Sequence, residues 1–459
     1  MTSTPELIAR TSATVDRPRR LTVVGCGYLG SVQAAAMAVI GHDVVGFDVD
    51  ADKVARLAKN DPPFYEPGLE ELLEAALASG RLRFTTSYAE AAAHGEIHFL
   101  CLGTPQRADS NAADTSAIEA VVDNLGPLLE RPCLVVGKST VPVGLAQQVR
   151  DRLVQLAPAG ADVHLAWSPE FTREGFAVQD ALEPDRVVVG VDRQEDADEL
   201  QEALAPVLAH GAPYVVTDLA TAQLVKNAAN AFLATKISFI NAMAELCEAT
   251  GADVVALADA IGYDARIGRK FLQAGLGFGG GCLPKDLRGF MARAEELGVD
   301  QALEFLREVD DINLRRRRRA VEVTTELLGG EVAGAQIAVL GAAFKPDSDD
   351  IRDSPALDVA HTLHELGAHV TVTDPKALDN ARRSRPGPAY VDDVREAVRD
   401  ADVVLHLTEW KAFRALDPVE LGTLVAHKRI LDGRNVLDAA AYVAAGWDLR
   451  ALGRPNAGH

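Results

Sequence analysis

Residues 21–30 read Leu-Thr-Val-Val-Gly-Cys-Gly-Tyr-Leu-Gly, and they decide the fold. The first four residues favour a short strand, and the alanine-rich stretch that continues to about Ile40 favours a helix. A second strand is predicted over residues 42–48 and ends in an acid. This order is typical of a dinucleotide-binding βαβ unit: a strand, the pattern G-x-G-x-x-G, a helix, a second strand and an acid.

The glycines and the acid predict how this unit holds a cofactor. Gly25, Gly27 and Gly30 would make the tight turn and admit a pyrophosphate to the helix N-terminus. Asp48 follows Gly30 at close to the usual separation of about 20 residues, and its carboxylate would accept hydrogen bonds from ribose hydroxyls and repel a 2′-phosphate. NAD is therefore favoured over NADP. Lys53 either contacts the cofactor or is a solvated lysine on a helix face.

Strands and helices continue to alternate up to about residue 217. Apolar runs at residues 97–102 and 133–136 predict strands that end in turns containing Thr104 and Thr140. Because ligands bind at the carboxyl ends of parallel strands, we expect these turns beside the cofactor. A later loop carries Glu170 and, four residues on, Glu174. These acids are either general acid–base groups or helix caps, and the sequence leaves both interpretations open.

After residue 217 the sequence pattern changes from alternating strands and helices to a helical central region. Residues 218–250 predict one long helix, and Lys226 and Asn230 share a face of it. Polar groups on a largely apolar helix are costly unless satisfied, so the pair either faces a ligand or hydrogen-bonds to another helix. Another long helix is predicted over about residues 300–328, with five arginines at 315–319. Because acids precede these arginines, we expect a solvated helix end and no nucleic-acid site.

A second β/α domain begins near residue 336, where an apolar run ends in Gly341. It lacks the three-glycine pattern, so we expect it to hold a nucleotide in another manner. The predicted fold is α/β, with two Rossmann-like doubly wound domains joined by a helical central domain. We expect a disordered tail at residues 1–19, an NAD-binding domain at 20–217, the central domain at 218–330 and the second Rossmann-like domain at 331–459.

Residues 271–286 read Phe-Leu-Gln-Ala-Gly-Leu-Gly-Phe-Gly-Gly-Gly-Cys-Leu-Pro-Lys-Asp. Such a glycine-rich backbone adopts positive φ angles and approaches a ligand closely. Pro284 allows a helix to begin beside Cys282, and the dipole of that helix, together with Lys285, favours a thiolate. We interpret Cys282 as a nucleophile, the alternative being a buried small hydrophobe. We give that second interpretation to the other cysteines, Cys26, Cys101, Cys133 and Cys247.

Composition excludes several classes of function. The net charge of −21 over 459 residues argues against a nucleic-acid partner and against attraction to anionic membranes. Apolar stretches are too short for a membrane span, and residues 1–19 lack the apolar core of a secretory signal. Five scattered cysteines do not indicate a disulfide framework, so we expect a reducing, cytoplasmic compartment. No pattern indicates a metal site.

Ordered motifs over nearly the whole chain resemble those of the nucleotide-sugar 6-dehydrogenases. They are Gly-Cys-Gly-Tyr-Leu-Gly, Tyr-Glu-Pro-Gly-Leu-Glu, Gly-Thr-Pro, Lys-Ser-Thr-Val-Pro-Val-Gly, Ser-Pro-Glu-Phe-Thr-Arg-Glu-Gly, Leu-Val-Lys-Asn-Ala-Ala-Asn, Gly-Phe-Gly-Gly-Gly-Cys-Leu-Pro-Lys-Asp, Phe-Lys, Asp-Ile-Arg and Asp-Gly-Arg. Within this family the chain most resembles the members that oxidise UDP-glucose. The resemblance implies a four-electron oxidation of UDP-glucose to UDP-glucuronate, with two NAD used in turn.

The same resemblance implies catalytic roles. After the sugar C6 hydroxyl is oxidised to an aldehyde, Cys282 would add to it as a thiohemiacetal. A second hydride transfer would leave a thioester, which water hydrolyses. The other implied roles belong to Thr140 and Asp286 (positioning the water), Glu170 (acid–base group), Lys226 (stabilising oxyanions or moving protons) and Asn230 (assisting).

Binding residues follow from the same matching. The expected cofactor contacts are Gly25, Gly27, Tyr28, Leu29, Gly30, Asp48, Lys53, Thr104, Thr140, Glu174, Lys285 and Arg352. The expected substrate contacts are Glu170, Phe171, Thr172, Arg173, Glu174, Lys226, Asn230, Arg266, Phe271, Leu272, Gln273, Ala274, Gly275, Gly279, Phe344, Lys345 and Arg434, of which Lys345, Arg266 and Arg434 would meet the diphosphate or the uridine. We expect a homodimer or a higher homo-oligomer, with the long helix from residue 218 as its surface.

The sequence departs from the family before Cys282, offers no firm match around Arg173 or in the loop 106–111, and leaves the substrate open. The residue before the cysteine is often serine in the family and is Gly281 here, which removes a hydroxyl donor. The alternative substrates are GDP-mannose and a UDP-N-acetylhexosamine. The sequence Leu-Pro-Lys-Asp after Cys282 argues against the UDP-N-acetylhexosamine. Only Arg434 and the sequence of residues 226–232 favour UDP-glucose over GDP-mannose.

Two other classes of protein compete with this interpretation. A two-electron hydroxy-acid dehydrogenase would need neither Cys282 nor a third domain. A non-catalytic nucleotide-binding module would keep its function after alkylation of Cys282.

Overall fold

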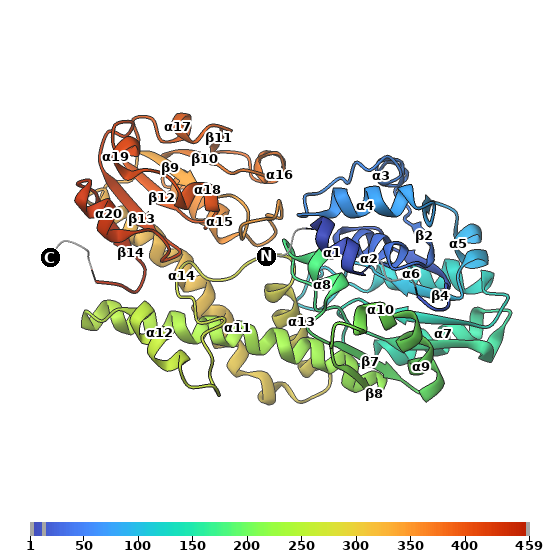
Figure 1. Cartoon of the computed structure of the whole chain (residues 1–459). Helices are drawn as coiled ribbons and strands as arrows, with labels where there is room; N and C mark the ends of the chain where they lie inside the picture. The colour runs from blue at the N-terminus through green and yellow to red at the C-terminus, as the bar shows by residue number, and fades with distance from the viewer. Residues whose placement is uncertain (1–3, 12–14, 456–459) are drawn as a thin grey trace. The chain divides into compact units, whose positions relative to one another are not determined.

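The computed structural model describes residues 4–11 and 15–455, which pack as two compact units (Figure 1). The first unit covers Met1–Ala229 and the second covers Asn230–His459. The long helix α11 (Leu219–Thr250) begins in the first unit and ends in the second. Among the described helices, none combines the length and the apolar character that a membrane span requires.

The described residues of the first unit form an eight-stranded sheet in the order β3-β2-β1-β4-β5-β6-β7-β8. Neighbouring strands run parallel except β6 and β7, which pair antiparallel. The order of the first six strands is that of the dinucleotide-binding doubly wound fold. The strands are β1 (Arg20–Val24), β2 (Asp43–Phe47), β3 (Leu82–Thr85), β4 (Ile97–Leu100), β5 (Cys133–Gly137), β6 (Val163–Trp167), β7 (Val187–Val191) and β8 (Tyr214–Thr217).

Helices cover both faces of this sheet, as the alternation of buried side chains requires. Val23 belongs to the apolar core that includes α2 (Tyr28–Val39) and α4 (Leu69–Ala78), whereas its neighbour Val24 belongs to the core that includes α6 (Ser116–Leu125) and α7 (Leu145–Leu156). The other helices of this unit are α3 (Ala51–Leu57), α5 (Tyr88–His94), η1 (Gly126–Leu128), η2 (Gly160–Asp162), α8 (Ala177–Leu182), α9 (Gln194–Ala203) and α10 (Ala205–Leu208).

The N-terminal tail departs from the prediction. Thr4–Thr11 form the helix α1, so the expectation of disorder over residues 1–19 is wrong for this segment. Leu7 is buried in the core of the first unit, and Ile8 packs against that core. These two apolar side chains, together with an ion pair between Arg10 and Glu183 (3.2 Å), dock a short helix that composition alone predicts to be solvated. Residues 1–3 and 12–14 lie outside the described residues.

The second unit combines helices with a six-stranded sheet, described in the order β11-β10-β9-β12-β13-β14, and all of its strand pairs are parallel. The strands are β9 (Gln336–Leu340), β10 (His369–Thr373), β11 (Ala389–Tyr390), β12 (Val403–His406), β13 (Arg429–Asp432) and β14 (Asp448–Ala451). The helices after α11 are α12 (Val254–Gly262), α13 (Leu283–Glu296), η3 (Asp300–Leu303), α14 (Phe305–Leu327), α15 (Pro355–Glu365), α16 (Leu378–Ser384), α17 (Val394–Ala397), α18 (Lys411–Arg414), α19 (Pro418–Leu421) and α20 (Ala439–Ala444).

Helix α14 carries the run of five arginines, and the expectation of a solvated helix end is wrong for two of them. Arg316 is 0% exposed and Arg317 is 6% exposed. Farther along the same helix, Ala320 and Val323 belong to the apolar core of the second sheet. Because this face of α14 is held against the core, the two arginines are carried inside with it, where carboxylates and backbone carbonyls receive them.

Candidate functional site

The three glycines of the first βαβ unit have three different surroundings. Gly25 has φ +91°, and a Cβ built on it would lie 2.7 Å from the carbonyl oxygen of Cys101. A Cβ on Gly30 would lie 1.8 Å from the carbonyl oxygen of Gly25. A Cβ on Gly27 would meet nothing within 4 Å, so the backbone at the N-terminus of α2 borders open space. This opening fits the approach of a pyrophosphate to the helix N-terminus.

Asp48 directly follows β2 and is 6% exposed. Its carboxylate accepts hydrogen bonds from the backbone N–H of Cys26 (2.9 Å) and of Asp50 (3.0 Å). Lys53 donates to the same carboxylate at 2.9 Å, so this lysine is paired with the acid and not simply solvated. Tyr28, at the start of α2, packs its ring on Phe64 with 4.3 Å between centroids. Leu29 packs against the apolar core of the first unit.

The turns after β4 and β5 are joined to each other. Thr104 Oγ1 donates to the carbonyl oxygen of Thr140 at 2.7 Å. Ser139 Oγ donates to the carbonyl oxygen of Leu102 at 2.6 Å and accepts from its N–H at 3.1 Å. The two predicted hydroxyl-bearing turns thus form one edge at the carboxyl ends of neighbouring parallel strands, where a cofactor binds in this class of sheet.

Glu170 is held in its ionised form. Burial by itself would raise the pKa of Glu170, but the charge of Lys138 and hydrogen bonds from Thr172, Lys138 and Phe171 outweigh burial, and the pKa is lowered. Lys138 Nζ lies 3.1 Å from the carboxylate. Nearby, the ammonium of Lys226, whose residue is 9% exposed, lies 5.3 Å from the centroid of the Phe171 ring. The first unit therefore brings together Glu170, Phe171, Thr172 and Lys226 of the predicted site.

The loop that contains Arg173 and Glu174 is held by an acid that the sequence analysis did not single out. Glu66 is 5% exposed and accepts hydrogen bonds from the N–H of Gly175 (2.8 Å) and Ala177 (2.7 Å). It lies in the motif Tyr-Glu-Pro-Gly-Leu-Glu, which was the only signal for it. Arg173 is exposed and forms an ion pair with Asp180.

Cys282 is the N-cap residue of α13, with Pro284 in the first turn of that helix, as predicted. Its side chain is exposed, whereas the other cysteines, Cys26, Cys101, Cys133 and Cys247, are buried. In the first turn of α13, Asp286 accepts a hydrogen bond from Asn230 Nδ2 at 2.6 Å and pairs with Lys285 Nζ at 2.6 Å. The second unit therefore brings Asn230, Asp286 and Lys285 together at the helix that begins after Cys282.

The glycines before Cys282 make room for neighbouring groups of the second unit itself. A Cβ on Gly279 would lie 2.2 Å from the carbonyl oxygen of Asp353, and one on Gly280 would lie 2.7 Å from the ring of Phe344. A Cβ on Gly281 would lie 2.1 Å from Cζ of Arg352. A side chain at position 281 would therefore displace the flexible end of Arg352.

Other predicted substrate residues divide between this loop and the surface. Arg434 donates to the carbonyl oxygens of Leu407 (2.7 Å), Gly277 (2.9 Å) and Phe344 (3.2 Å), so its guanidinium joins the loop to the second sheet. The ammonium of Lys345 lies 5.2 Å from the centroid of the Phe344 ring. The residues that lead into the loop are Phe271 (φ +66°), Leu272 (buried), Gln273 (exposed), Ala274 (buried) and Gly275 (buried).

Arg266 is not brought to this loop within the second unit. Its side chain is 87% exposed and pairs with Asp264 at 2.6 Å. Arg352, predicted as a cofactor contact, pairs with Asp350 at 2.7 Å.

The second sheet has an acid at the position that corresponds to Asp48, and that acid has a structural use. Asp374 is 4% exposed and accepts hydrogen bonds from the N–H of Ala342 (2.8 Å), Ala343 (3.0 Å) and the indole of Trp410 (3.0 Å). A buried carboxylate with these donors braces the turn after β9.

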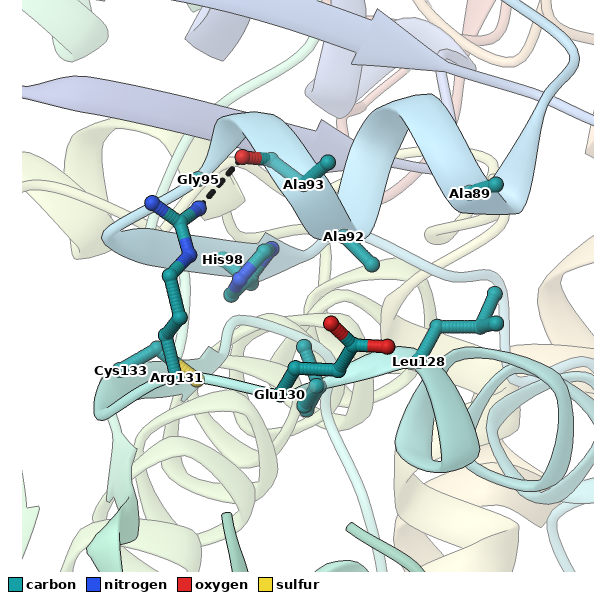
Figure 2. Close-up of a pocket in the computed structure, with 10 residues that line it drawn as sticks. Ala89, Ala92, Ala93, Gly95, His98, Leu128, Glu130, Arg131 and Cys133 are labelled. Carbon is teal, nitrogen blue, oxygen red and sulfur yellow. Dashed lines mark hydrogen bonds between the residues drawn. The ribbon is translucent and has the colours of Figure 1, made fainter. Parts of the chain in front are cut away.

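One cavity of the first unit lies away from all of these residues. It has a volume of about 230 Å³, and the residues that line it include Ala92, His98, Leu128, Arg131 and Cys133 (Figure 2). His98 and Cys133 stand at the beginnings of β4 and β5, whereas the predicted cofactor turns follow the ends of these strands. Burial lowers the pKa of His98 to about 4. We therefore do not assign this cavity to the predicted cofactor and substrate site.

Family models match the chain in three consecutive parts. The NAD binding domain of the UDP-glucose/GDP-mannose dehydrogenase family matches residues 19–208, its central domain matches residues 220–315, and its UDP binding domain matches residues 338–439. The chain belongs to the UDP-glucose/GDP-mannose dehydrogenase family. It is therefore an NAD-dependent oxidoreductase, and the resemblance seen in the sequence is confirmed, as is the predicted fold class.

Full-length relatives support the same assignment. The chain is 40% identical over 452 residues to a UDP-glucose 6-dehydrogenase of Pseudomonas aeruginosa (96% of this chain, 98% of the relative) and 39% identical over 439 residues to one of Rhizobium meliloti (95% and 100%). A solved UDP-glucose dehydrogenase of Pyrobaculum islandicum is 38% identical with a TM-score of 0.88 (95% and 98% covered). A UDP-D-ManNAc dehydrogenase of Pyrococcus horikoshii is 26% identical with a TM-score of 0.84 (95% and 99%).

Proposed function

We propose that this family member catalyses the four-electron oxidation of UDP-glucose to UDP-glucuronate through a thioester on Cys282. The observation that carries the proposal is Cys282 itself, the exposed cysteine of the chain, at the N-cap of α13 beside Asp286, Lys285 and Asn230. Identities of 38–40% to proteins named UDP-glucose 6-dehydrogenase support the choice of sugar nucleotide.

The reaction divides into steps that this chain's residues serve. Loss of a hydride from C6 and of the hydroxyl proton gives an aldehyde, and the Cys282 thiolate adds to its carbon, so that a C–S bond forms and the oxygen becomes an alkoxide. Loss of a second hydride from the same carbon re-forms the C=O bond as a thioester. Water then adds, the C–S bond breaks and the thiolate returns as the carboxylate forms. NAD, when bound, supplies the hydride acceptor in both oxidations.

Local electrostatics support the use of a thiolate and of a base. The N-terminus of α13, at which Cys282 is the N-cap residue, favours a negative sulfur. Asn230 and Lys285 hold Asp286 as an acceptor, which suits a role in orienting water. Glu170, kept ionised by Lys138, has the protonation state that a base for the hydrolytic water needs. Lys226 would stabilise the oxyanions. Thr140 would help to position the hydrolytic water.

NADH stoichiometry tests the proposal. Purified protein would receive UDP-glucose, GDP-mannose or UDP-N-acetylglucosamine with excess NAD, and NADH would be counted per sugar nucleotide consumed. We expect two NADH per UDP-glucose, loss of turnover in Cys282→Ala, and retention of turnover in the control Cys247→Ala, which removes a buried thiol. One NADH per sugar would refute the thioester route, and turnover of GDP-mannose alone would move the assignment to the other branch.

We also propose that the chain acts as a homodimer or a higher homo-oligomer through α11. Phe232, Phe239 and Leu246 recur every seventh residue on this helix and are 66%, 49% and 57% exposed. Three large apolar side chains in one stripe of a helix are characteristic of a covered surface. Light scattering after size-exclusion chromatography should show a dimer or larger assembly, and Phe239→Glu should shift the protein towards the monomer. A monomer at micromolar concentration in the unmodified protein would refute this proposal.

A further inference from the structure

Three polar side chains of α14 remain without a role in the proposed reaction, although all three are buried. Asn313 and Arg316 are 0% exposed and Arg317 is 6% exposed. A buried guanidinium is costly unless its charge and its N–H groups are matched, so its partners indicate what it is there to hold. We call these three residues the α14 clamp. We call residues 275–281, which precede Cys282, the glycine loop.

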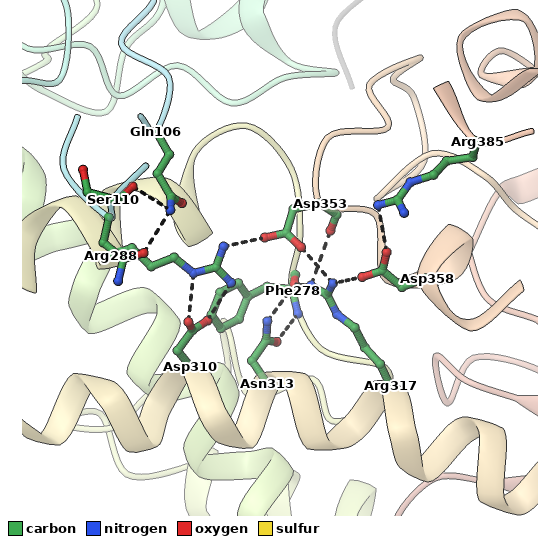
Figure 3. Close-up of polar contacts among 11 residues, drawn as sticks. Gln106, Ser110, Phe278, Arg288, Asp310, Asn313, Arg317, Asp353, Asp358 and Arg385 are labelled. Carbon is green, nitrogen blue, oxygen red and sulfur yellow. Dashed lines mark hydrogen bonds and ion pairs between the residues drawn. The ribbon is translucent and has the colours of Figure 1, made fainter. Parts of the chain in front are cut away.

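The α14 clamp binds the backbone of the glycine loop. Asn313 closes a two-way contact with Phe278, since its Oδ1 accepts from the Phe278 N–H at 2.7 Å and its Nδ2 donates to the Phe278 carbonyl oxygen at 3.0 Å. Arg317 donates to the same carbonyl oxygen at 3.2 Å. Figure 3 shows Asn313 and Arg317 converging on Phe278. Arg316 donates to the carbonyl oxygen of Gly275 at 3.3 Å.

The other backbone group of Gly275 is bound from a second helix. Asn241, which is 0% exposed on α11, accepts from the N–H of Gly275 at 2.9 Å. Side chains therefore bind both the N–H and the C=O of two loop residues, Gly275 and Phe278. In a helix or a strand, regular backbone pairing would satisfy these groups. In the glycine loop, single backbone hydrogen bonds hold Leu276 and Gly280 (2.8 Å each), and side chains hold Gly275 and Phe278.

Carboxylates fix the clamp in turn. Arg317 forms ion pairs with Asp353 (2.8 Å) and with Asp358, and Asp353 also pairs with Arg288 at 3.4 Å. Arg288 lies on α13 and pairs with Asp310 of α14 at 2.9 Å. A closed path thus leads from α14 to the Asp353 turn, on to α13 and back to α14 (Figure 3).

Cys282 lies between the two places where this network holds the chain. Phe278 is bound four residues before it and Arg288 is bound six residues after it, both by groups of α14. Glycines supply little resistance to bending, so the position of the thiol depends on the attachments that flank it. These two act together with the backbone hydrogen bond from the Gly280 N–H to the carbonyl oxygen of Arg352 (2.8 Å). A displacement of about 1 Å costs a reaction about a hundredfold in rate when the reacting atoms must meet.

We propose that Asn313 and Arg317 are positioning residues that fix the glycine loop and thereby the reaction geometry of Cys282. The inference rests on the proposed function, because it assumes that Cys282 is the nucleophile. The arginine run of α14 then has two parts: Arg316 and Arg317 face the loop, whereas Arg318 is exposed.

The test compares Arg317→Met and Asn313→Ser with the control Arg318→Met, a change of the same chemistry at the exposed neighbour. Amide hydrogen exchange of the peptide that covers residues 271–282 should accelerate about tenfold or more in the first two variants and remain unchanged in the control. The value of kcat for NADH formation should fall about tenfold or more, with KM for NAD changed by less than about twofold. Arg317→Lys should recover part of both effects, because lysine keeps the charge but lacks the guanidinium fork.

Several results would overturn the proposal. Unchanged exchange in both variants would mean that the clamp does not order the loop. Faster exchange with an unchanged kcat would mean that loop order does not position the thiol. If Arg317→Met does not fold, Asn313→Ser and Arg317→Lys still report both quantities. Full activity in Cys282→Ala would refute the proposed function and not this inference. The exchange measurement would still decide whether Asn313 and Arg317 hold the loop.

Discussion

Acid destabilisation through His98 is the prediction whose magnitude follows most directly from the structure. His98 is 0% exposed at the start of β4, and neither ring nitrogen hydrogen-bonds to a described residue. Burial, with smaller contributions from the positive charge of His94 and Arg131, lowers its pKa from 6.5 to about 4. The folded chain therefore keeps this imidazole neutral at a pH where the unfolded chain protonates it.

The sign follows from proton linkage. Between about pH 6.5 and pH 4 the unfolded state binds more protons than the folded state, so the free energy of unfolding falls as the pH falls through that window. Each pH unit below the unfolded-state pKa lowers the free energy of unfolding by about 1.4 kcal/mol until the folded-state pKa is reached. The loss is therefore about 2 kcal/mol at pH 5 and about 3 kcal/mol below pH 4. Above pH 7 the contribution of His98 to this pH dependence vanishes.

The assay is urea unfolding at pH 7.5 and pH 5, followed by far-UV circular dichroism. Other groups titrate in the same range, so the informative quantity is the difference between variants. Between pH 7.5 and pH 5, the free energy of unfolding should fall by about 2 kcal/mol less in His98→Gln than in the unmodified protein. The control His210→Gln, at an exposed histidine of the same unit, should behave as the unmodified protein does. Equal pH dependence in His98→Gln and the unmodified protein would refute the reasoning.

Three further predictions concern the predicted site. Gly279→Ala should destabilise the protein by about 1–3 kcal/mol in urea because its Cβ would meet the backbone of Asp353, whereas Gly281→Ala meets only the flexible end of Arg352 and should cost less than about 1 kcal/mol. The opposite order would contradict the packing described for the loop. Glu66→Gln should cost about 1–3 kcal/mol and lower Tm, because an amide NH2 group replaces one of the two carboxylate oxygens that accept backbone hydrogen bonds; an unchanged Tm would contradict this role. Asp48→Asn should raise KM for NAD about tenfold and weaken discrimination against NADP, and an unchanged ratio of the two KM values would argue against a ribose contact.

Short-range patterns in the sequence predicted most of the fold. Residues 21–30 and the acid at Asp48 specify a strand, a turn, a helix and a strand within about 30 residues, and β1, α2 and β2 appear there. Cys282 and Pro284 similarly specify a helix start from adjacent residues, and Cys282 is the N-cap of α13. In each case the deciding interactions are local, so the residue types and their spacing contain the information.

Tertiary structure alone decided which polar residues are buried and what they contact. A run of five arginines indicates solvent when it is read alone, yet Arg316 and Arg317 are buried because their helix packs against an apolar core that lies elsewhere in the sequence. Asn230 meets Asp286 across 56 residues, and Glu66 meets Gly175 across 109. Such partners come together only when the chain folds, so their positions are properties of the packed molecule and not of any segment.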